Sequence, residues 1–400
     1  MKVITGWLSG LLAIVLATGI IRYPELPAYG AEKPIRIGAT VSLEGSYSKL
    51  SFMVKNGYEL WAKEVNERGG ILGRKVELLF YDDKSREDLV GPLYEKLIAE
   101  DKVDMVFSPY SSTLTVQASA VTEKYGYVML AAAASAEEIW TRGFKSMFGV
   151  YSTADRYFVG FLDLAAREKL KRVAVIYSNT AFNIAAADGV KKWAGLFGLT
   201  LVLSKKYDAY ETELAAIVDS LRSKDIEGLI FCAYPPDSYF FLKLLQDMKF
   251  RPPGLAIAIA PALPDFFTKV GPFAEGIFGP SQWEADKRLP FPGTLEFIEK
   301  FVAVTGEKPD YHACSAYSAG QIIEKAVLLA GTIDQKKIRN YIATLDTVTI
   351  LGRFKVDSEG RQVGHNPMLI QWQKGVKEIV YPTKMQTAPG YFAKNNGLKQ

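Results

Sequence analysis

Apolar runs and helical stripes alternate along most of the chain. Between the runs, apolar residues recur at the i, i+4 and i+7 spacing of an amphipathic helix, as at Val54, Tyr58 and Trp61. Alternation of this kind indicates parallel sheets with crossover helices, so the pattern predicts an α/β fold of doubly wound parallel sheets. The predicted strands lie at residues 35–41, 75–81, 103–107, 127–131, 172–177, 200–204, 227–232 and 255–260.

The pattern changes after about residue 275. Residues 294–343 carry helical periodicity almost throughout, and residues 347–381 return to short strands separated by glycine-containing turns. The polar, glycine-containing stretch 383–400 predicts a flexible tail.

The first thirty residues have the three parts of a secretory signal. Lys2 supplies the positive start, the apolar run from Trp7 to Ile21 follows, and small residues precede Ala31. The run is about 15 residues long, whereas roughly 20 are needed to span a bilayer. We expect residues 1–30 to be a cleaved signal peptide and the mature protein to be periplasmic; a retained membrane anchor is the alternative. No cysteine follows the run, which argues against lipid anchoring.

Composition narrows the class of protein. The remaining 370 or so residues suit two domains better than one. With 48 basic and 44 acidic residues and no long charge run, nothing indicates nucleic acid or an anionic membrane as a partner. Cys232 and Cys314 are too few for a disulfide framework, and we expect two buried thiols rather than a bridge.

The sequence shows no set of residues with the spacing of a known catalytic or metal site. His312 and His365 are far apart in the chain and lack metal-ligand spacing, and no nucleophile elbow or phosphate-binding glycine loop occurs. We therefore expect no catalytic residues, no metal and no cofactor, and a secreted enzyme is a disfavoured alternative.

Hydroxyl-rich segments follow several predicted strands. They lie at residues 46–48, which include Tyr47, at residues 109–113 and at residues 133–135. In a doubly wound sheet, ligands bind beyond the carboxyl ends of the strands, where helix N-termini suit a carboxylate. A single serine there usually caps its own helix, but three converging segments predict that at least one contacts a ligand.

These segments belong to a wider resemblance. From about residue 34 to 382, the chain resembles the periplasmic leucine/isoleucine/valine-binding proteins, the substrate receptors of branched-chain amino acid-type ABC transporters. The residues that carry the resemblance are Ile37-Gly38, Ser42, Gly45, Asn56-Gly57, Val65-Asn66, Gly69-Gly70-Ile71, Gly73, Tyr81-Asp82-Asp83, Thr141-Arg142-Gly143-Phe144 and the run Arg172-Val173-Ala174-Val175-Ile176.

The resemblance implies a type I periplasmic binding fold of two lobes joined by three crossing segments that close on a ligand like a hinge. One lobe would comprise residues 34–151 and 283–350, and the other residues 155–280 and 352–382. The crossings would fall near residues 151–154, 280–284 and 349–353.

The resemblance also implies a ligand site. Ser112 and Ser135 align with the hydroxyl residues that receive the ligand's carboxylate, and Ala133 aligns with a backbone carbonyl contact. Phe182 and Tyr234 align with aromatic residues that close over the ligand. Aromatic residues in the same segments would complete the lining: Tyr47, Tyr110, Trp140 and Tyr151, with Trp140 the one best explained by core packing.

The acidic partner for a ligand ammonium does not align. Its position falls on Ala260 or Pro261, and Asp265, Asp155 and Asp237 are substitutes without a secure match. An ammonium that loses water without a partner costs several kcal/mol. The ligand is therefore either an amino acid or an aromatic or apolar carboxylate without the α-amino group, with a slight preference for the latter.

The resemblance implies a membrane permease and its ATPase as partners of a monomeric receptor. A sensory module that signals to a membrane partner is the alternative. A sugar-responsive repressor with the same fold would need a helix-turn-helix where this chain has its export signal.

Overall fold

The structure is a computed structural model and describes residues 33–289 and 291–393. The predicted signal peptide, residues 1–30, lies outside the described residues, as do residues 394–400 of the predicted tail. In the described part of the chain, no helix combines the length and hydropathy needed to cross a membrane.

The first half of the chain begins with parallel strands, as the alternating pattern predicts. A three-stranded sheet has the order β2-β1-β3, and β4 pairs in parallel with β5. The strands are β1 (Ile35–Val41), β2 (Val76–Asp82), β3 (Met105–Val106), β4 (Met129–Ala131) and β5 (Met147–Gly149). The helices between them are α1 (Ser48–Glu67), α2 (Glu87–Glu95) with the π-helical turn η1 (Lys96–Glu100), α3 (Ser112–Tyr125) and α4 (Glu138–Thr141).

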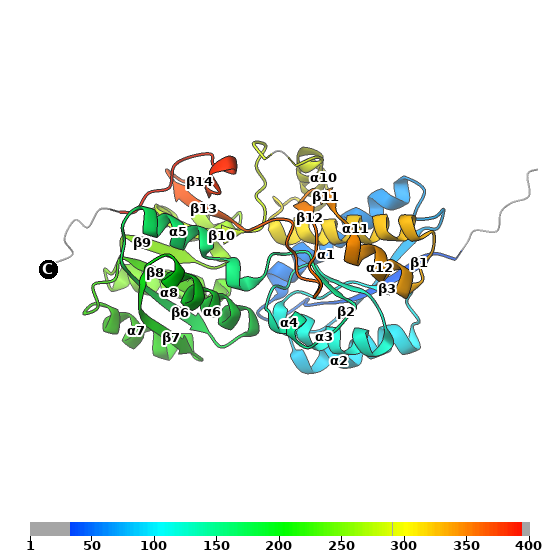
Figure 1. Cartoon of the computed structure of the whole chain (residues 1–400), viewed down its shortest axis with the longest axis horizontal. Coiled ribbons are helices and arrows are strands. Elements are labelled where there is room, and N and C mark those ends of the chain that lie inside the picture. The colour runs from blue at the N-terminus through cyan, green and yellow to red at the C-terminus, as the bar shows by residue number, and fades with distance from the viewer. Residues whose placement is uncertain (1–32, 290, 394–400) are drawn as a thin grey trace, which may run out of the picture. The chain divides into compact units, whose positions relative to one another are not determined.

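A seven-stranded sheet follows, in the order β14-β13-β10-β9-β8-β6-β7. Its members are β6 (Arg172–Ser178), β7 (Thr200–Tyr207), β8 (Gly228–Cys232), β9 (Gly254–Ile257), β10 (Ile277–Ser281), β13 (Met368–Gln373) and β14 (Val376–Tyr381). The first five are parallel, whereas β13 and β14 are antiparallel and extend the β10 edge (Figure 1). Associated helices are η2 (Ala154–Arg156), α5 (Val159–Arg167), α6 (Ala181–Leu196), α7 (Tyr210–Leu221), α8 (Pro235–Asp247), η3 (Ala260–Ala262), α9 (Phe266–Val270) and η4 (Gly271–Ala274).

The predicted helical block lies between β10 and β13. It consists of α10 (Thr294–Thr305), α11 (Tyr311–Ala330) and α12 (Gln335–Thr344), followed by the β11 (Thr347–Thr349) and β12 (Gly352–Phe354) hairpin. In Figure 1, α11 lies beside α1 from the start of the chain. Gly57 and Gly320 permit this approach, because a Cβ on Gly57 would lie 2.3 Å from the Ala313 carbonyl and one on Gly320 would lie 2.2 Å from the Trp61 ring. The start of α11 is thereby held against the first sheet.

The α/β class, with its mostly parallel sheets, is confirmed, and each of the eight predicted strands corresponds to an observed one. Strands β5 and β10 were not predicted. Strand β10 contains Gly279 and Pro280, which are usually strand breakers. It forms because it is held between β9 and β13. The two cysteines are buried free thiols, as predicted.

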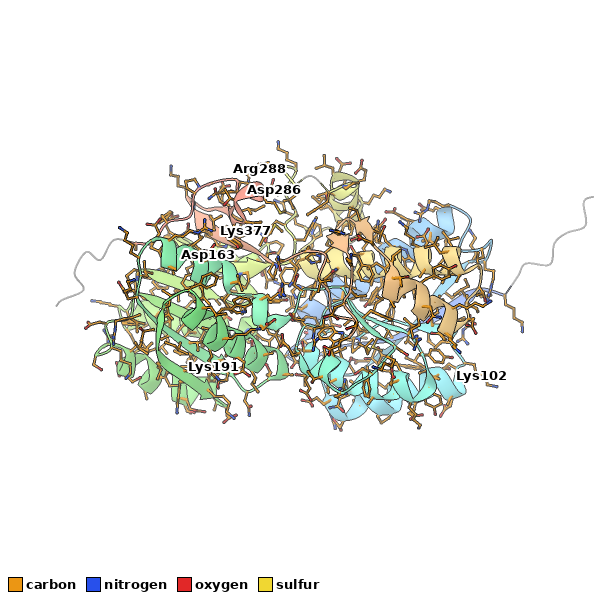
Figure 2. The ribbon with its side chains drawn as sticks, in the orientation of Figure 1. Lys102, Asp163, Lys191, Asp286, Arg288 and Lys377 are labelled. Atoms are coloured by element: carbon orange, nitrogen blue, oxygen red, sulfur yellow. The ribbon has the colours of Figure 1, made fainter. Side chains whose placement is uncertain are left out.

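Charged side chains bind β14 to the segment that follows β10. Lys377 donates to the buried carboxylate of Glu284 and to the carbonyl of Ala262. Arg288 pairs with Asp286 at 2.6 Å and with Glu378 at 3.0 Å. Figure 2 shows Lys377, Asp286 and Arg288 at this edge.

The segment predicted as the start of a flexible tail makes contacts. Residues 383–385 form the short helix η5 (Thr383–Met385), and the Ala393 amide donates to the Pro253 carbonyl at 3.0 Å. The Phe392 ring lies 5.0 Å from that of Phe278, over Gly254, where a Cβ would clash with it. An aromatic side chain and backbone hydrogen bonds thus attach residues 383–393 to the sheet, and the flexible tail stays a prediction.

The lobe boundaries and the three crossings remain a prediction. The first two sheets draw their strands from residues 35–149, and the seven-stranded sheet draws its strands from residues 172–281 and 368–381.

Candidate functional site

Six of the seven predicted ligand-binding residues line one cavity. The full lining is Tyr110, Ser112, Ala133, Ser135, Tyr151, Tyr157, Phe182, Tyr234, Ile259, Tyr311 and His312. The seventh residue, Tyr47, lies next to this cavity. Its ring centroid is 5.8 Å from that of Tyr110 and 5.0 Å from that of Tyr234. Trp140 is absent from the lining and packs against Gly149, which agrees with a core role.

The topology explains why these residues meet. Tyr110 follows β3, Ala133 and Ser135 follow β4, and Tyr151 follows β5. Phe182, Tyr234 and Ile259 follow β6, β8 and β9 of the seven-stranded sheet. Since all these strands are parallel to their partners, the lining comes from carboxyl ends of strands, where α/β folds bind ligands.

Ser112 joins two of the loops at the start of α3. Its Oγ accepts hydrogen bonds from the backbone N–H groups of Ser135, at 3.0 Å, and Ala136, at 3.2 Å. Both lone pairs of the oxygen are thus engaged, whereas its own proton is left to be donated. The hydroxyl can therefore donate a further hydrogen bond but has no lone pair left to accept one.

The N-terminus of α3 has further unused polar groups. The N-cap Ser111 makes no capping hydrogen bond. The buried Oγ of Ser111 and Oγ1 of Thr113 have no hydrogen-bond partner among the described residues. The first N–H groups of a helix lack partners within the helix and carry a partial positive charge. This end of α3 is therefore suited to an anion.

Tyrosine hydroxyl groups lie near the N-terminus of α3, and their raised pKa values keep them protonated. Burial raises the pKa of Tyr157 to about 12, although Ser135 and Gln282 beside its hydroxyl oppose the rise. Burial also raises the pKa of Tyr47 and Tyr234, and Ser111 opposes both shifts. At neutral pH these groups are uncharged hydrogen-bond donors, and they add no negative charge to the cavity.

A buried Asp–His pair stands at the start of α11. Asp310 caps the helix, its Oδ1 accepting from the N–H groups of His312, at 2.9 Å, and Ala313, at 3.3 Å. Its Oδ2 lies 3.3 Å from Nδ1 of His312. The imidazole stacks on Tyr311 with ring centroids 4.1 Å apart and meets the edge of Tyr110 at 5.2 Å. Burial pushes the pKa of Asp310 upward, but His312 and the two N–H groups hold it below its usual value.

Tyr157, Ile259, Tyr311 and His312 were not predicted as site residues. Tyr311 and His312 look like the apolar face of a helix in sequence, and the chain separates them widely from Tyr110. The signal available was Asp310, an N-cap residue two positions before a histidine.

None of the eleven lining residues is acidic. Asp155 pairs with Lys192 at 3.1 Å, Asp237 accepts from Tyr207 at 2.6 Å, and Asp265 pairs with Lys49 and Lys269. The 260–262 segment, where the resemblance would place an acid, is a buried apolar turn. The substitutes considered for an ammonium partner are all engaged elsewhere.

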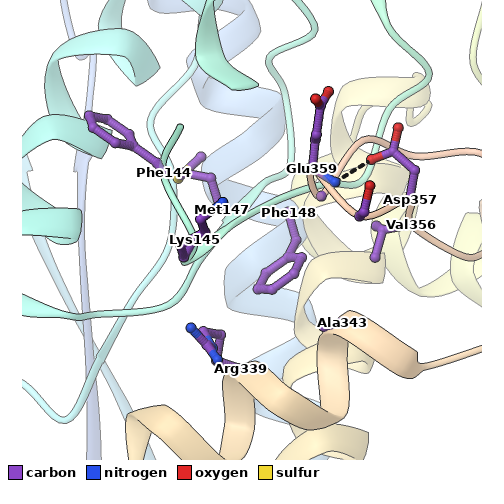
Figure 3. A pocket seen from close by; sticks show the side chains of 11 residues that line it. Phe144, Lys145, Met147, Phe148, Arg339, Ala343, Val356, Asp357 and Glu359 are labelled. Atoms are coloured by element: carbon purple, nitrogen blue, oxygen red, sulfur yellow. Dashed lines mark hydrogen bonds between the residues drawn. The ribbon is translucent and has the colours of Figure 1, made fainter. Parts of the chain in front are cut away.

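A larger cavity lies away from these strand ends. It has a volume of about 310 Å³, against about 20 Å³ for the cavity at the strand ends, and is lined by β5, α12 and the 356–360 turn (Figure 3). Its acidic groups are engaged within the turn, where Asp357 accepts from the N–H of Glu359 at 2.9 Å and both carboxylates contact Arg361. Lys145 and Glu359 at its edge are exposed. Because ligand sites bury most of their ligand, we favour the site at the strand ends, where all the lining side chains are buried.

Comparisons with known proteins identify the family of the chain. A family model described as periplasmic binding protein matches residues 34–377. Leu/Ile/Val-binding protein homolog 7 of Brucella suis biovar 1 is 24% identical over 376 residues, which cover 88% of this chain and 92% of that relative.

Solved structures with the same fold include ABC transporter solute-binding proteins. One from R. palustris, in complex with benzoate, has a TM-score of 0.76 at 18% identity, covering 87% of this chain and 95% of that one. LivJ from Streptococcus pneumoniae, in complex with isoleucine, has a TM-score of 0.77 at 18% identity, covering 87% of this chain and 100% of that one. The family match spans most of the chain, which therefore belongs to the periplasmic binding protein family.

Proposed function

We propose that this protein is a solute receptor that captures a small aromatic or apolar carboxylate lacking an α-amino group. The observation that carries the proposal is the composition of the cavity at the strand ends. Its lining combines hydroxyl groups at the N-terminus of α3 with aromatic rings and contains no carboxylate. We propose that binding involves no catalysis and no cofactor.

The carboxylate of the ligand would lie at the start of α3. The proton of Ser112, the unpaired hydroxyl of Ser111 and the free N–H groups of the helix can donate to it. Hydrogen bonds to an ionised acceptor contribute roughly 1.5–3 kcal/mol each, about twice a neutral one. Ser135 and Tyr157 stand beside the same group as further donors. This end of the cavity can replace the water that a carboxylate loses.

An ammonium group would find no comparable partner in the lining. A micromolar receptor has only about 8 kcal/mol of binding free energy in total. Desolvating an ammonium without an anionic partner would cost several kcal/mol of it. The rings of Tyr110, Phe182 and Tyr234 favour an apolar or aromatic group instead.

Ligand entry requires the cavity to enlarge. Its volume of about 20 Å³ is room for about one water molecule, far less than a benzene ring needs. Since the lining comes from strand ends of three sheets, two in the first proposed lobe and one in the second, separation of the proposed lobes would open it. We propose that the closed, liganded form delivers its ligand to an ABC permease and its ATPase, and that the receptor acts as a periplasmic monomer. The ABC transporter neighbours support this role.

The decisive experiment compares acids that differ only by the amino group. Thermal unfolding of the protein is followed with phenylalanine against 3-phenylpropionate, and with leucine against 4-methylpentanoate, with benzoate as a further acid. A ligand at 100 times its dissociation constant adds about 2.7 kcal/mol of stability, and we expect this rise in Tm only with the deaminated acids. Benzamide, which lacks the carboxylate, is the negative control. Stabilisation by leucine or phenylalanine with none by the matched acids would contradict the proposal.

An uptake assay distinguishes a transport role from a sensory role. Cells that lack this protein should import the labelled acid more slowly, and the gene restored should recover uptake. Unchanged uptake, with loss of a transcriptional response to the same acid, would favour the sensory alternative.

A further inference from the structure

The Asp310–His312 pair gives one wall of the cavity a defined hydrogen-bonding character. His312 lines the cavity, whereas Asp310 lies behind it and is almost fully buried. Around the imidazole stand the rings of Tyr110, Tyr151 and Tyr311. The described residues place no hydrogen-bond partner on the other ring nitrogen, Nε2.

Asp310 favours Nδ1 as the site of the proton on a neutral His312 through its charge, because Oδ2 and Nδ1 are close but neither has a hydrogen-bond partner among the described residues. Its Oδ2 faces Nδ1 at 3.3 Å, and a carboxylate there favours a proton on Nδ1. The backbone N–H groups of His312 and Ala313, which donate to Oδ1, hold the carboxylate in place. With the proton on Nδ1, Nε2 is a hydrogen-bond acceptor. The cavity thus has donors for a carboxylate at α3 and an acceptor at the start of α11.

We propose that His312 selects a ligand that carries a hydroxyl group in addition to its carboxylate, and that the substrate class is the hydroxy-substituted aromatic acids. The inference rests on the proposed function and extends it. The ligand hydroxyl donates to Nε2 of His312, and Asp310 acts as a positioning residue through the imidazole. A ligand that lacks the hydroxyl leaves this acceptor desolvated and unpaired, which weakens its binding.

The test measures affinity ratios by calorimetry with the mature protein. The probes are benzoate, the three monohydroxybenzoates and the corresponding fluorobenzoates, because fluorine is close to a hydroxyl in size but cannot donate. We expect at least one hydroxybenzoate to bind roughly 5- to 10-fold more tightly than benzoate and its fluoro analogue, the worth of one hydrogen bond.

Two variants assign this preference to the pair. His312→Phe should reduce the ratio to about 1, whatever its effect on the affinity for benzoate itself. His365→Gln, which changes the other histidine outside this lining, is the matched control and should leave the ratio unchanged. Asp310→Asn keeps a capping oxygen for α11 but removes the carboxylate that holds the proton on Nδ1. For this variant an aminobenzoate is added as a probe, because its amino group donates but accepts weakly. The unmodified protein should prefer it to benzoate, and Asp310→Asn should remove that preference.

The outcomes separate the two proposals. Equal affinity for benzoate and all hydroxybenzoates, or a ratio that survives both His312→Phe and Asp310→Asn, would overturn the role of His312 and leave the carboxylate receptor intact. Binding of none of these acids, with stabilisation by leucine, would overturn the proposed function and this inference with it.

Discussion

At the scale of single residues, Ser112 has a structural and a proposed binding role. Its Oγ is the acceptor for the buried N–H groups of Ser135 and Ala136, so it holds the β4 loop to α3. Ser135 lines the same cavity but accepts no such pair. Removing the hydroxyl of Ser112 should therefore cost more unfolding free energy than removing that of Ser135.

We expect Ser112→Ala to lower both stability and ligand affinity. Two buried N–H groups lose their acceptor, which costs about 1–3 kcal/mol of unfolding free energy. Ser135→Ala should weaken carboxylate binding by roughly 5-fold and change stability by less than about 1 kcal/mol. Urea unfolding without ligand and calorimetry with benzoate measure the two effects.

Ser238→Ala is the control for this pair. Ser238 is equally buried, on α8, but lies outside the lining, so benzoate affinity should not change. Equal losses of stability for Ser112→Ala and Ser135→Ala would show that the two N–H groups do not depend on Ser112.

At the scale of elements, α6 shows how a glycine places a site residue. A Cβ on Gly189 would lie 2.2 Å from the carbonyl oxygen of Asp155, so the helix packs directly on the backbone of η2. Phe182, in the first turn of α6, reaches the cavity because of this approach. Gly195, near the end of the same helix, has nothing within 4 Å of the added Cβ.

Alanine at these two positions should have opposite effects. Gly189→Ala gains helix propensity of about 1 kcal/mol but forces α6 off η2, and we expect a net loss of about 1–3 kcal/mol with weaker ligand binding. Gly195→Ala should stabilise by up to about 1 kcal/mol and leave affinity unchanged. Denaturant unfolding of both variants tests this; a stabilising Gly189→Ala would mean that α6 and η2 are not in contact in solution.

Local pattern accounts for most of the elements and for part of the site. Strands such as β6 and β8 are continuous apolar runs, and their periodicity needs no knowledge of their neighbours. Strand β10 could not be found in this way, since Pro280 disfavours a strand and only the flanking β9 and β13 stabilise it.

The site was predictable where it follows directly from strand ends. Tyr110 and Ser112 come after β3 and Ser135 comes after β4, so each could be placed at the carboxyl end of a parallel strand, although the two strands belong to different sheets. His312 could not be placed, because its position depends on α11 packing against α1 through Gly57 and Gly320. Such a contact between distant parts of the chain leaves no periodic signal in the sequence.

At the scale of the whole molecule, the side chains of Glu137 and Asp155 form a carboxyl pair. The pair connects the loop after β4 to η2, near the first proposed crossing. The Asp155 amide donates to Glu137 at 3.1 Å, and Asp155 also contacts Lys192 at 3.1 Å and Thr153 at 2.7 Å. Burial and the neighbouring Asp155 raise the pKa of Glu137 to about 8, from an ordinary 4.5. Burial acts to raise the pKa of Asp155, but Glu137, Thr153 and Lys192 hold it below its usual value.

This pair makes global stability depend on pH in one direction near neutrality. The raised pKa of Glu137 means that the folded state holds its proton more tightly than the unfolded state does, so this stabilisation is complete below about pH 4.5 and is lost as the pH rises through about 8. The lowered pKa of Asp155 acts oppositely, but its contribution is lost only in acid, below its ordinary value of 3.8. Between pH 5 and pH 9, therefore, we expect the free energy of unfolding to fall by up to about 4 kcal/mol on account of Glu137.

Glu137→Gln isolates the effect, because glutamine mimics the protonated acid and cannot ionise. Urea unfolding at pH 5, 7 and 9 should give a clearly flatter pH dependence for this variant than for the unmodified protein. Glu138→Gln changes the exposed neighbour and serves as the control, which should keep the original dependence. Since η2 also packs against α6, where Phe182 lines the cavity, ionisation of Glu137 should also weaken benzoate binding at pH 9. Parallel pH curves for the protein and Glu137→Gln would show that this carboxyl does not change protonation on unfolding in that range.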